Sequence, residues 1–285
     1  MKFSTLYSQN DRVYSFEFFP PKDPDHLSRT LGLVERMSHL KPDYMTVTYG
    51  AGGSTRGLTQ EITHYIVQEL QVPSVAHLTC VGLSRAEIDE VLDDFAGAGI
   101  TNILALRGDP PKGQGVFVPH PDGFSCARDL AAHIQQRGDF SIAVSGYPEG
   151  HPEACSSEEE LEYLRQKVEA GGEVILTQLF FDSDVFLRFV EKARAAGIHA
   201  PIVPGILPIS NLAQLDRIAS LCGASIPSEL RAKLEHYGDD KESLRAYGTE
   251  FALNQCRTLL SNGAPGIHFY TLNKSRQVEE ILSVL

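Results

Sequence analysis

The chain has 285 residues, of which 42% are hydrophobic and 22% are charged, a length and composition that suit a globular protein with a large core. Its formal net charge is −12, from 25 basic and 37 acidic residues, and the sequence contains no block of Lys or Arg. Nucleic acid and anionic membranes are therefore poor candidates for partners. The sequence also lacks a run of about 18 apolar residues, which a membrane-spanning helix needs.

The cysteines and the N-terminus indicate a cytoplasmic protein. The five cysteines are odd in number, widely separated and never spaced as Cys-x-x-Cys, so we expect reduced thiols and no structural zinc. The polar segment from Met1 to Arg12 does not resemble a signal peptide.

Short β-rich runs alternate with helical patterns along the chain. The runs are nearly continuous in apolar residues, which is typical of strands covered on both faces. The predicted strands are 13–19, 43–49, 74–80, 102–107, 141–147, 174–180, 201–206 and 267–272. The predicted helices are 25–39, 56–70, 84–98, 124–137, 157–171, 183–196, 210–222 and 274–284, with an extra helical pair within 227–262.

Capping residues mark several of these helices. Serines precede three of them as predicted N-caps, and glycines follow four of them as predicted C-terminal caps. The serines are Ser84, Ser183 and Ser210, and the glycines are Gly99, Gly138, Gly172 and Gly197.

Eight strand–helix units predict an α/β fold in which a parallel sheet closes into a (β/α)8 barrel, with extra helices before the last strand. No linker, repeat or low-complexity segment divides the chain, so we expect one domain over residues 1–285. An open, doubly wound sheet is the alternative. It is disfavoured because Pro20-Pro21, and not a Gly-rich dinucleotide fingerprint, follows the first strand. The Gly- and Pro-rich segment from Pro110 to Gly123 is predicted to be a long, mobile loop.

Glu17 lies inside the first predicted strand, among Phe16, Phe18 and Phe19. Removal from water disfavours the charged form of a carboxyl group. A buried glutamate can therefore hold a proton near neutral pH and act as a general acid. The alternative is a structural glutamate paired with a Lys or Arg, because such pairs also perturb carboxyl groups.

Polar residues gather where the predicted strands end. The active site of a (β/α)8 barrel forms at the carboxyl ends of its strands, so we expect these residues to converge on one rim. Some of these residues have an alternative, structural interpretation. His77 could be a core histidine whose hydrogen bonds are satisfied within the protein, and Arg107 and Asp109 could form an ion pair with each other. In chain order the rim residues are Glu17, Thr48, Tyr49, His77, Thr79, Arg107 to Asp109, Ser145 to Glu149, His151, Gln178, Pro204 to Pro208, His268 and Tyr270.

Two chemistries fit such a rim. A metal-dependent lyase or hydrolase could use Glu17, His77, Asp109 and His151, but the His-x-His and His-Glu-x-x-His spacings of many such sites are missing. A cofactor enzyme fits better, because aromatic, amide and hydroxyl groups beside an acid and an acid–Arg pair suit a flat heterocyclic ligand. A binding barrel without catalysis would leave Glu17 and Asp109 without a role.

Eight motifs at the predicted strand ends together resemble the methylenetetrahydrofolate reductase family, flavin enzymes of one-carbon metabolism. The resemblance runs from about residue 13 to the end of the chain. The motifs are Ser15-Phe16-Glu17-Phe18-Phe19-Pro20-Pro21, Thr46-Val47-Thr48-Tyr49-Gly50, His77-Leu78-Thr79-Cys80, Leu106-Arg107-Gly108-Asp109, Tyr147-Pro148-Glu149-Gly150-His151-Pro152, Thr177-Gln178-Leu179-Phe180-Phe181-Asp182, Pro204-Gly205-Ile206-Leu207-Pro208 and His268-Phe269-Tyr270-Thr271-Leu272-Asn273.

The resemblance implies an FAD-dependent enzyme that reduces 5,10-methylenetetrahydrofolate to 5-methyltetrahydrofolate and feeds methionine synthesis. A reduced nicotinamide nucleotide would reduce the flavin and leave before folate binds, in a ping-pong scheme. NADH is favoured, with NADPH and a protein donor left open. The chain would be the catalytic barrel alone, as in bacterial-type members, and a homo-oligomer. A flavin-free lyase or transferase barrel that binds folate is the alternative.

By the same resemblance, Glu17 is the general acid that protonates the leaving nitrogen of the folate ring. Asp109 is the acid beside the flavin pyrimidine, where its charge would make the reduced flavin a better hydride donor and stabilise a nearby iminium cation. Gln178 would hydrogen-bond the pterin, and Tyr270 and Lys274 would line the substrate side. The residues matched to cofactor contacts are Thr48, His77, Arg107, Gly108, Asp109, Ser145, Tyr147, His151 and Lys167.

Lys167 and Leu212 carry alternatives of their own. Lys167 falls in the helix after the fifth strand, where it could meet the diphosphate or ribose of the cofactor or simply be a solvated lysine. Leu212 stands where the family has an aromatic residue that packs on the bound substrate or nucleotide. A leucine covers an apolar face but cannot stack as a ring does, which bears on the affinity for the donor and on its identity.

Overall fold

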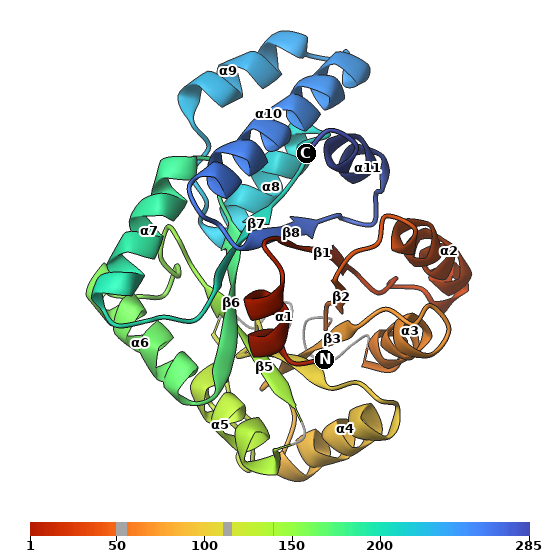
Figure 1. Cartoon of the computed structure of the whole chain (residues 1–285), viewed down its shortest axis with the longest axis vertical. Helices are drawn as coiled ribbons and strands as arrows, with labels where there is room; N and C mark the ends of the chain where they lie inside the picture. Colours follow the sequence, from red (N-terminus) through yellow and green to blue (C-terminus); the bar gives the residue numbers. More distant parts are fainter. Residues whose placement is uncertain (50–55, 111–115, 139) are drawn as a thin grey trace.

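The computed structural model describes residues 1–49, 56–110, 116–138 and 140–285, and at its centre eight parallel strands form a closed barrel (Figure 1). The strands follow one another around the barrel in chain order, and the first closes against the last. The predicted (β/α)8 barrel is therefore confirmed. The strands are β1 (Val13–Phe18), β2 (Tyr44–Val47), β3 (Ser74–Thr79), β4 (Asn102–Leu106), β5 (Ser141–Gly146), β6 (Gly172–Leu179), β7 (Ile202–Ile206) and β8 (Gly266–Tyr270).

Helices surround this barrel, and the predicted extra pair before the last strand is present as α9 (Ser228–Tyr237) and α10 (Lys241–Ser261). No helix in the described ranges is long and apolar enough to cross a membrane. Gly50 and residues 111–115 of the predicted Pro110–Gly123 loop lie outside the described residues. The other helices around the barrel are α2 (Leu27–Ser38), which follows the short turn η1 (Pro24–His26), α3 (Arg56–Gln68), α4 (Arg85–Gly97), α5 (Ala127–Arg137), α6 (Ser157–Glu169), α7 (Ser183–Ala195), α8 (Leu212–Cys222) and α11 (Arg276–Leu282).

The alternation of side chains along β1 separates an outer core from the interior of the barrel. Phe16 and Phe18 pack outward into the large core between strands and helices, whereas Val13 belongs to a smaller cluster inside the barrel. Successive side chains of a strand point to opposite faces. Ser15 and Glu17 therefore share the inward face of β1 with Val13. Because Glu17 is near the end of β1, its carboxyl group lies inside the barrel, close to the mouth where the strands end.

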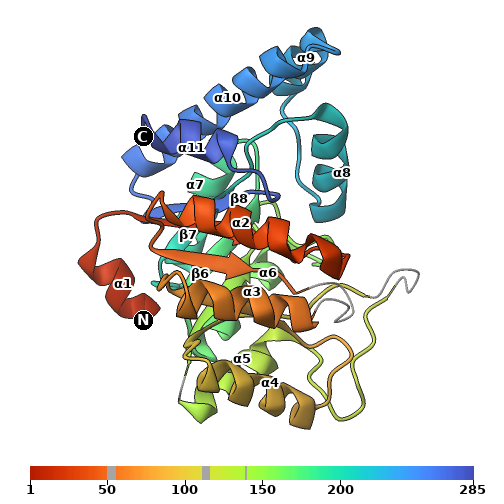
Figure 2. The same ribbon diagram turned by 90° about the vertical axis from the view of Figure 1, so that its right-hand side faces the viewer.

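A helix at the N-terminus, α1 (Phe3–Gln9), was not predicted. It lies across the end of the barrel where the strands begin, as seen end-on in Figure 1 and from the side in Figure 2. Phe3 is buried in the inner cluster, and its amide N–H donates to Ser141 Oγ at 2.9 Å. The sequence signal is weak because this segment of seven residues has one buried side chain and so shows no helical periodicity.

The predicted helix caps are partly confirmed. Ser84 caps α4 in a capping box with Glu87. The predictions for Ser183 and Ser210 were wrong by one residue, because the side chains of Asp182 and Asn211 accept the first free N–H groups of α7 and α8.

Gly172 was also wrongly predicted as a cap, because it opens β6. The residue after α6 with positive φ is Gly171, at 119°, whereas the other three predicted cap glycines have φ between 77° and 79°.

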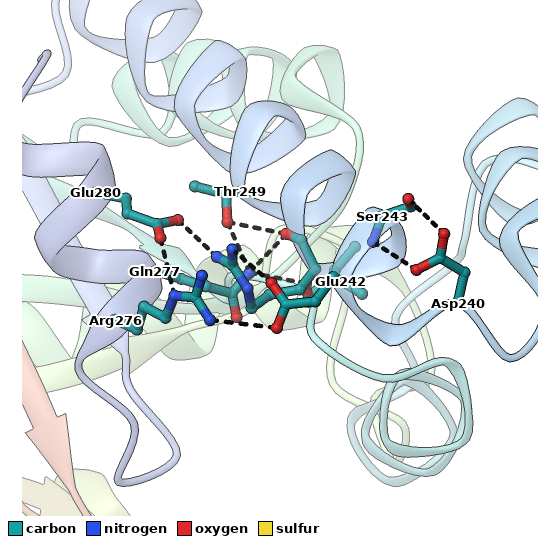
Figure 3. A network of polar contacts seen from close by, with 9 residues as sticks. Asp240, Glu242, Ser243, Thr249, Arg276, Gln277 and Glu280 are labelled. Carbon is teal, nitrogen blue, oxygen red and sulfur yellow. Dashed lines mark hydrogen bonds and ion pairs between the residues drawn. The ribbon is translucent and has the colours of Figure 1, made fainter.

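A polar network joins α10 and α11 and reaches the segment after β7 (Figure 3). Gln277 on α11 donates from Nε2 to the main-chain oxygen of Ile209 at 2.9 Å and to Thr249 Oγ1 at 3.1 Å. The network therefore fixes the chain that leads from β7 into α8. Its ion pairs are Arg276 with Glu242, Arg276 with Glu280, Arg245 with Glu280, and Arg245 with Glu242.

Candidate active site

Two histidines converge on one carboxylate oxygen inside the barrel. Glu17 Oε2 on β1 lies 3.5 Å from Nε2 of His77 on β3 and 3.5 Å from Nε2 of His268 on β8. Glu17 is 5% exposed and His268 is fully buried. Among the described residues, no Lys or Arg pairs with Glu17. The alternative interpretation, a structural glutamate paired with a Lys or Arg, is therefore wrong for these residues.

His77 is neutral at pH 7. Burial lowers the pKa of its imidazole to about 4, the nearby Glu17 carboxyl opposes this shift, and His268 adds to it. Its Nε2 atom is buried and has no hydrogen-bond partner in the described chain, so His77 is not the satisfied core histidine of the alternative interpretation. This nitrogen faces the carboxyl group of the predicted general acid.

A cavity of about 400 Å³ brings together five of the predicted cofactor residues, which are Arg107, Ser145, Tyr147, His151 and Lys167. The rings of Tyr147 and His151 meet edge to face, with centroids 4.8 Å apart. The main-chain N–H of Glu153 donates to His151 Nδ1 at 3.1 Å. In the neutral imidazole the proton therefore lies on Nε2, which can donate to a ligand.

Lys167 is buried in the wall of this cavity and is not a solvated lysine. Its Nζ atom donates to the main-chain oxygen of Ser145 at 2.7 Å and lies 4.9 Å from the ring centroid of Tyr163 and 5.7 Å from that of Tyr147. Burial lowers the pKa of Lys167 to about 8, against the opposing influence of Glu160. The side chain of Lys167 therefore carries a positive charge at neutral pH, in a wall that also contains Glu160.

Glu160 is a candidate site residue that sequence reasoning missed. It is buried, it lines the cavity, and its Oε1 atom has no hydrogen-bond partner within the described residues. Burial raises the pKa of its carboxyl group. In the sequence it is one of three consecutive acids in the first turn of a helix, where the helix dipole favours acids, so it does not stand out as a site residue. A signal was available, because Glu160 precedes Lys167 by two helical turns and so shares its face of α6.

Arg107 pairs with Glu153 and not with Asp109. Its Nη2 atom donates to Glu153 Oε1 at 3.0 Å, and its guanidinium group lies 5.1 Å from the ring centroid of Phe117. The hydrogen bond to Glu153 is the main cause of the raised pKa of Arg107, and the charge of Asp109 contributes last. Asp109 itself is exposed at the rim. Glu153 could not be identified from the sequence, because an exposed acid in a loop belongs to no periodic pattern.

Gly108 and Thr48 shape the rim through their main chains. Gly108 has a φ of +86°, and a Cβ atom there would lie 2.6 Å from Val81 Cγ2, so the turn from Arg107 to Asp109 needs glycine. The Thr48 N–H donates to the Phe18 oxygen at 2.9 Å, which ties the end of β2 to the end of β1.

The rim at β6 and β8 is tightly packed. Tyr270 donates from its hydroxyl to the main-chain oxygen of Thr177 at 2.7 Å. A Cβ atom on Gly205 would lie 2.4 Å from the same oxygen and 2.5 Å from Tyr270 Cε2, so glycine is what lets Tyr270 cross this part of the barrel. Gln178 is half-buried, and its Oε1 atom accepts a hydrogen bond from the N–H of Leu179 at 3.0 Å.

Leu212 and Lys274 come together at the start of α8. Leu212 is the first residue of α8 and, like Tyr270, packs against the apolar cluster that includes Leu207 and Leu215. Lys274 donates from Nζ to Ser210 Oγ at 2.9 Å. The segment after β8 is thus joined to the segment after β7, as expected if both line one surface. In the described ranges, no three His, Cys, Asp or Glu side chains gather in a cluster that could hold a metal ion.

Comparisons of the sequence with protein families and with individual proteins agree on one family. A family profile described as Methylenetetrahydrofolate reductase matches residues 2–285. The Arabidopsis thaliana protein "Methylenetetrahydrofolate reductase (NADH) 1" is 43% identical, over 99% of this chain and 49% of its own length. The Escherichia coli "5,10-methylenetetrahydrofolate reductase" is 36% identical, over 95% of this chain and 90% of its own length. The chain thus spans about half the length of the plant relatives that it matches.

Solved structures share the fold at lower identity. An uncharacterized protein from Clostridium thermocellum that binds two copies of 5-methyl-5,6,7,8-tetrahydrofolic acid has a TM-score of 0.63 at 15% identity, covering 99% of this chain and 97% of that one. Dihydropteroate synthase from Xanthomonas albilineans, in complex with 7,8-dihydropteroate, has a TM-score of 0.52 at 13% identity, covering 96% of this chain and 92% of that one.

Proposed function

We propose that this chain, which belongs to the methylenetetrahydrofolate reductase family, catalyses the FAD-dependent reduction of 5,10-methylenetetrahydrofolate to 5-methyltetrahydrofolate. The names of the bacterial relatives support the substrate. NADH is the proposed donor, supported by the names of the plant relatives, and it leaves before folate binds in a ping-pong cycle. The methylated product would feed methionine synthesis.

The observation that carries this proposal is the environment of Glu17. Its carboxyl group is 5% exposed and has two imidazole Nε2 atoms 3.5 Å from one oxygen. This environment fits a role of Glu17 in proton transfer better than a structural role as the partner of a Lys or Arg. Reduction of the methylene carbon requires the folate ring to open, and the leaving nitrogen then needs a proton. Glu17 supplies that proton and leaves an iminium cation on the folate as the group to be reduced.

The residues of the cavity fit FAD. Arg107 and Lys167 provide positive charge for a diphosphate, His151 offers an N–H donor, and the unpartnered oxygen of Glu160 can accept a bond from a hydroxyl group. When bound, FAD supplies the hydride that reduces the methylene carbon of folate. Asp109, exposed at the rim, adds a negative charge that stabilises the iminium cation.

The substrate side is proposed to be built from the ends of β6 and β8 and the start of α8. Gln178 would hydrogen-bond the pterin, while Leu212, Tyr270 and Lys274 would line the surrounding surface. The bond from Lys274 to Ser210 supports one continuous wall. A cytoplasmic location is supported by the five free cysteines, and a homo-oligomer is proposed from the family resemblance.

The visible spectrum of the purified protein tests this function. We expect flavin bands that bleach when NADH is added without air and return when methylenetetrahydrofolate follows. Flavin that does not bleach with NADH would contradict NADH as the donor. Protein that binds no flavin, even with added FAD, would contradict the reductase and favour a flavin-free lyase or transferase that binds folate.

A further inference from the structure

A line of buried polar groups runs from Glu17 through the barrel interior towards the opposite mouth. His268 Nε2 lies 3.5 Å from Glu17 Oε2, and His268 Nδ1 lies 2.8 Å from Ser15 Oγ. Ser15 also stands opposite Tyr44 in the strand register, and the Tyr44 hydroxyl lies 2.9 Å from the hydroxyl of Tyr7 on α1. The line therefore connects the proposed acid to the helix that covers the other end of the barrel.

The strand register holds the central part of this line in place. Ser15 on β1 stands directly opposite Tyr44 on β2 and directly opposite His268 on β8. All three residues are fully buried. The ring of Tyr270 packs edge-on against the His268 ring at 5.2 Å. The imidazole of His268 is thus bonded at Nδ1 and packed against Tyr270, while its buried Nε2 atom lies 3.5 Å from Glu17 Oε2 and has no hydrogen-bond partner among the described residues.

A neutral imidazole carries its proton on one nitrogen and accepts with the other, and the bond at one nitrogen decides which. If the Ser15 hydroxyl donates to Nδ1, the proton of His268 lies on Nε2, the atom that faces Glu17. That N–H can orient the carboxyl group through Oε2 and leave Oε1 for the folate. His77 faces the same oxygen, but within the described residues its ring makes no hydrogen bond that would fix its tautomer in this way.

We propose that His268 is a positioning residue, kept in one tautomer by Ser15, that holds the Glu17 carboxyl group in the orientation needed for proton transfer. The inference rests on the proposed role of Glu17 as the proton donor. It adds His268 and Ser15 to the residues on which the folate half-reaction depends, although neither needs to touch the substrate.

Two substitutions of His268 separate positioning from packing. His268→Gln places an amide nitrogen as many bonds from Cα as Nε2, so a donor still faces Glu17. His268→Asn places the amide nitrogen at the level of Nδ1, so the contact with Ser15 can persist while the group beside Glu17 is lost. Ser15→Ala keeps the imidazole but removes the bond that fixes its tautomer.

The measurement is the reoxidation of flavin by methylenetetrahydrofolate, after each FAD-loaded variant has been reduced with dithionite without air. We expect His268→Asn to slow the limiting rate roughly 10- to 100-fold, because a small misplacement of a catalytic group has effects of this size. The folate concentration at half-maximal rate and the affinity for FAD should stay at the wild-type values. His268→Gln should recover most of the rate, and Ser15→Ala should fall between wild type and His268→Asn.

A wild-type rate for His268→Asn would overturn the proposal. Equal slowing in the Asn and Gln variants would also overturn it, because the loss would then not depend on the atom at the Nε2 position. If His268→Asn does not fold, Ser15→Ala decides, and a wild-type rate for that variant counts against the proposal. Failure of the proposed function looks different, because wild-type protein would then bind no flavin or its reduced flavin would not respond to folate.

Discussion

The ammonium group of Lys167 donates a hydrogen bond to the main-chain oxygen of Ser145 at 2.7 Å, from a side chain that is 1% exposed. The bond ties α6 to the end of β5, where the candidate cofactor cavity lies. Burial lowers the pKa of Lys167 to about 8, so the side chain is largely charged at pH 7 and loses its charge as the pH rises through about 8. A buried cation in the wall of this cavity should strengthen the binding of an anionic ligand such as FAD.

Lys167→Met should weaken FAD binding. Loss of one charge-assisted hydrogen bond to a diphosphate is worth about 1.5–3 kcal/mol, so we expect the Kd for FAD to rise roughly 10- to 100-fold. The wild-type affinity should also fall as the pH rises through about 8, and the variant should lack this dependence. Fluorescence titration with FAD measures both, with Lys233→Met on the exposed face of α9 as the control. Wild-type affinity in Lys167→Met would contradict this role.

His77 should make the fold sensitive to acid. Its pKa is lowered to about 4 in the folded chain, against an ordinary value of 6.5. Between pH 6.5 and 4 the unfolded chain binds a proton that the folded chain does not, so this contribution to the free energy of unfolding is complete above pH 6.5 and is lost as the pH falls. The loss amounts to about 3 kcal/mol.

Urea titrations at several pH values between 4 and 7 measure this dependence. The free energy of unfolding of His77→Gln should fall less steeply with acid than that of wild type. His199→Gln, at an exposed position, is the control. Parallel slopes for wild type and His77→Gln would show that His77 does not carry the effect.

Gly205→Ala should destabilise the rim at β7. The added Cβ atom would lie 2.4 Å from the Thr177 oxygen and 2.5 Å from Tyr270 Cε2, and overpacking of this kind costs about 1–3 kcal/mol. Gly32→Ala is the matched control, because nothing lies within 4 Å of its added Cβ atom and alanine favours helix by up to about 1 kcal/mol. Thermal melting should therefore move in opposite directions for the two variants. A Gly205→Ala variant as stable as wild type would contradict the packing.

Gln277→Leu should loosen the segment that leads into α8. It removes the donor to the buried Ile209 oxygen, and an unsatisfied buried group costs about 1–3 kcal/mol. Since this segment carries Leu212, we also expect a higher KM for the substrates. Denaturant unfolding and steady-state kinetics test the two effects, with Gln136→Leu on the exposed side of α5 as the control. An unchanged free energy of unfolding would mean that the bond contributes nothing.

The sequence was most informative where strands end. A strand in a closed parallel barrel is covered on both faces, so its apolar run is continuous and the first polar residue after or within it stands out. Glu17, His77 and Gln178 could be found in this way, and they do lie near the carboxyl ends of β1, β3 and β6. The register Ser15 opposite His268 could not be found, because pairing between the first and last strands leaves no trace in either segment.

Residues outside strands were harder to assign. Glu160 looked like one of three acids that favour the first turn of a helix, although its place on the face of α6 shared with Lys167 buries it. Glu153 is exposed in a loop and has its partner Arg107 in a distant segment, so nothing local identifies it. The same reason explains the missed helix α1, which is defined by the barrel mouth that it covers and has little pattern of its own.

The most direct test of the account is the reoxidation rate of dithionite-reduced Glu17→Gln by methylenetetrahydrofolate. Glutamine keeps the shape of the side chain but has no proton to give, so the rate should fall roughly 10²- to 10⁴-fold while reduction of the oxidised flavin by NADH keeps its wild-type rate. Reoxidation at the wild-type rate would contradict Glu17 as the proton donor. Equal slowing of both half-reactions in a folded variant would contradict it as well, because the residue would then support the cofactor and not the folate chemistry.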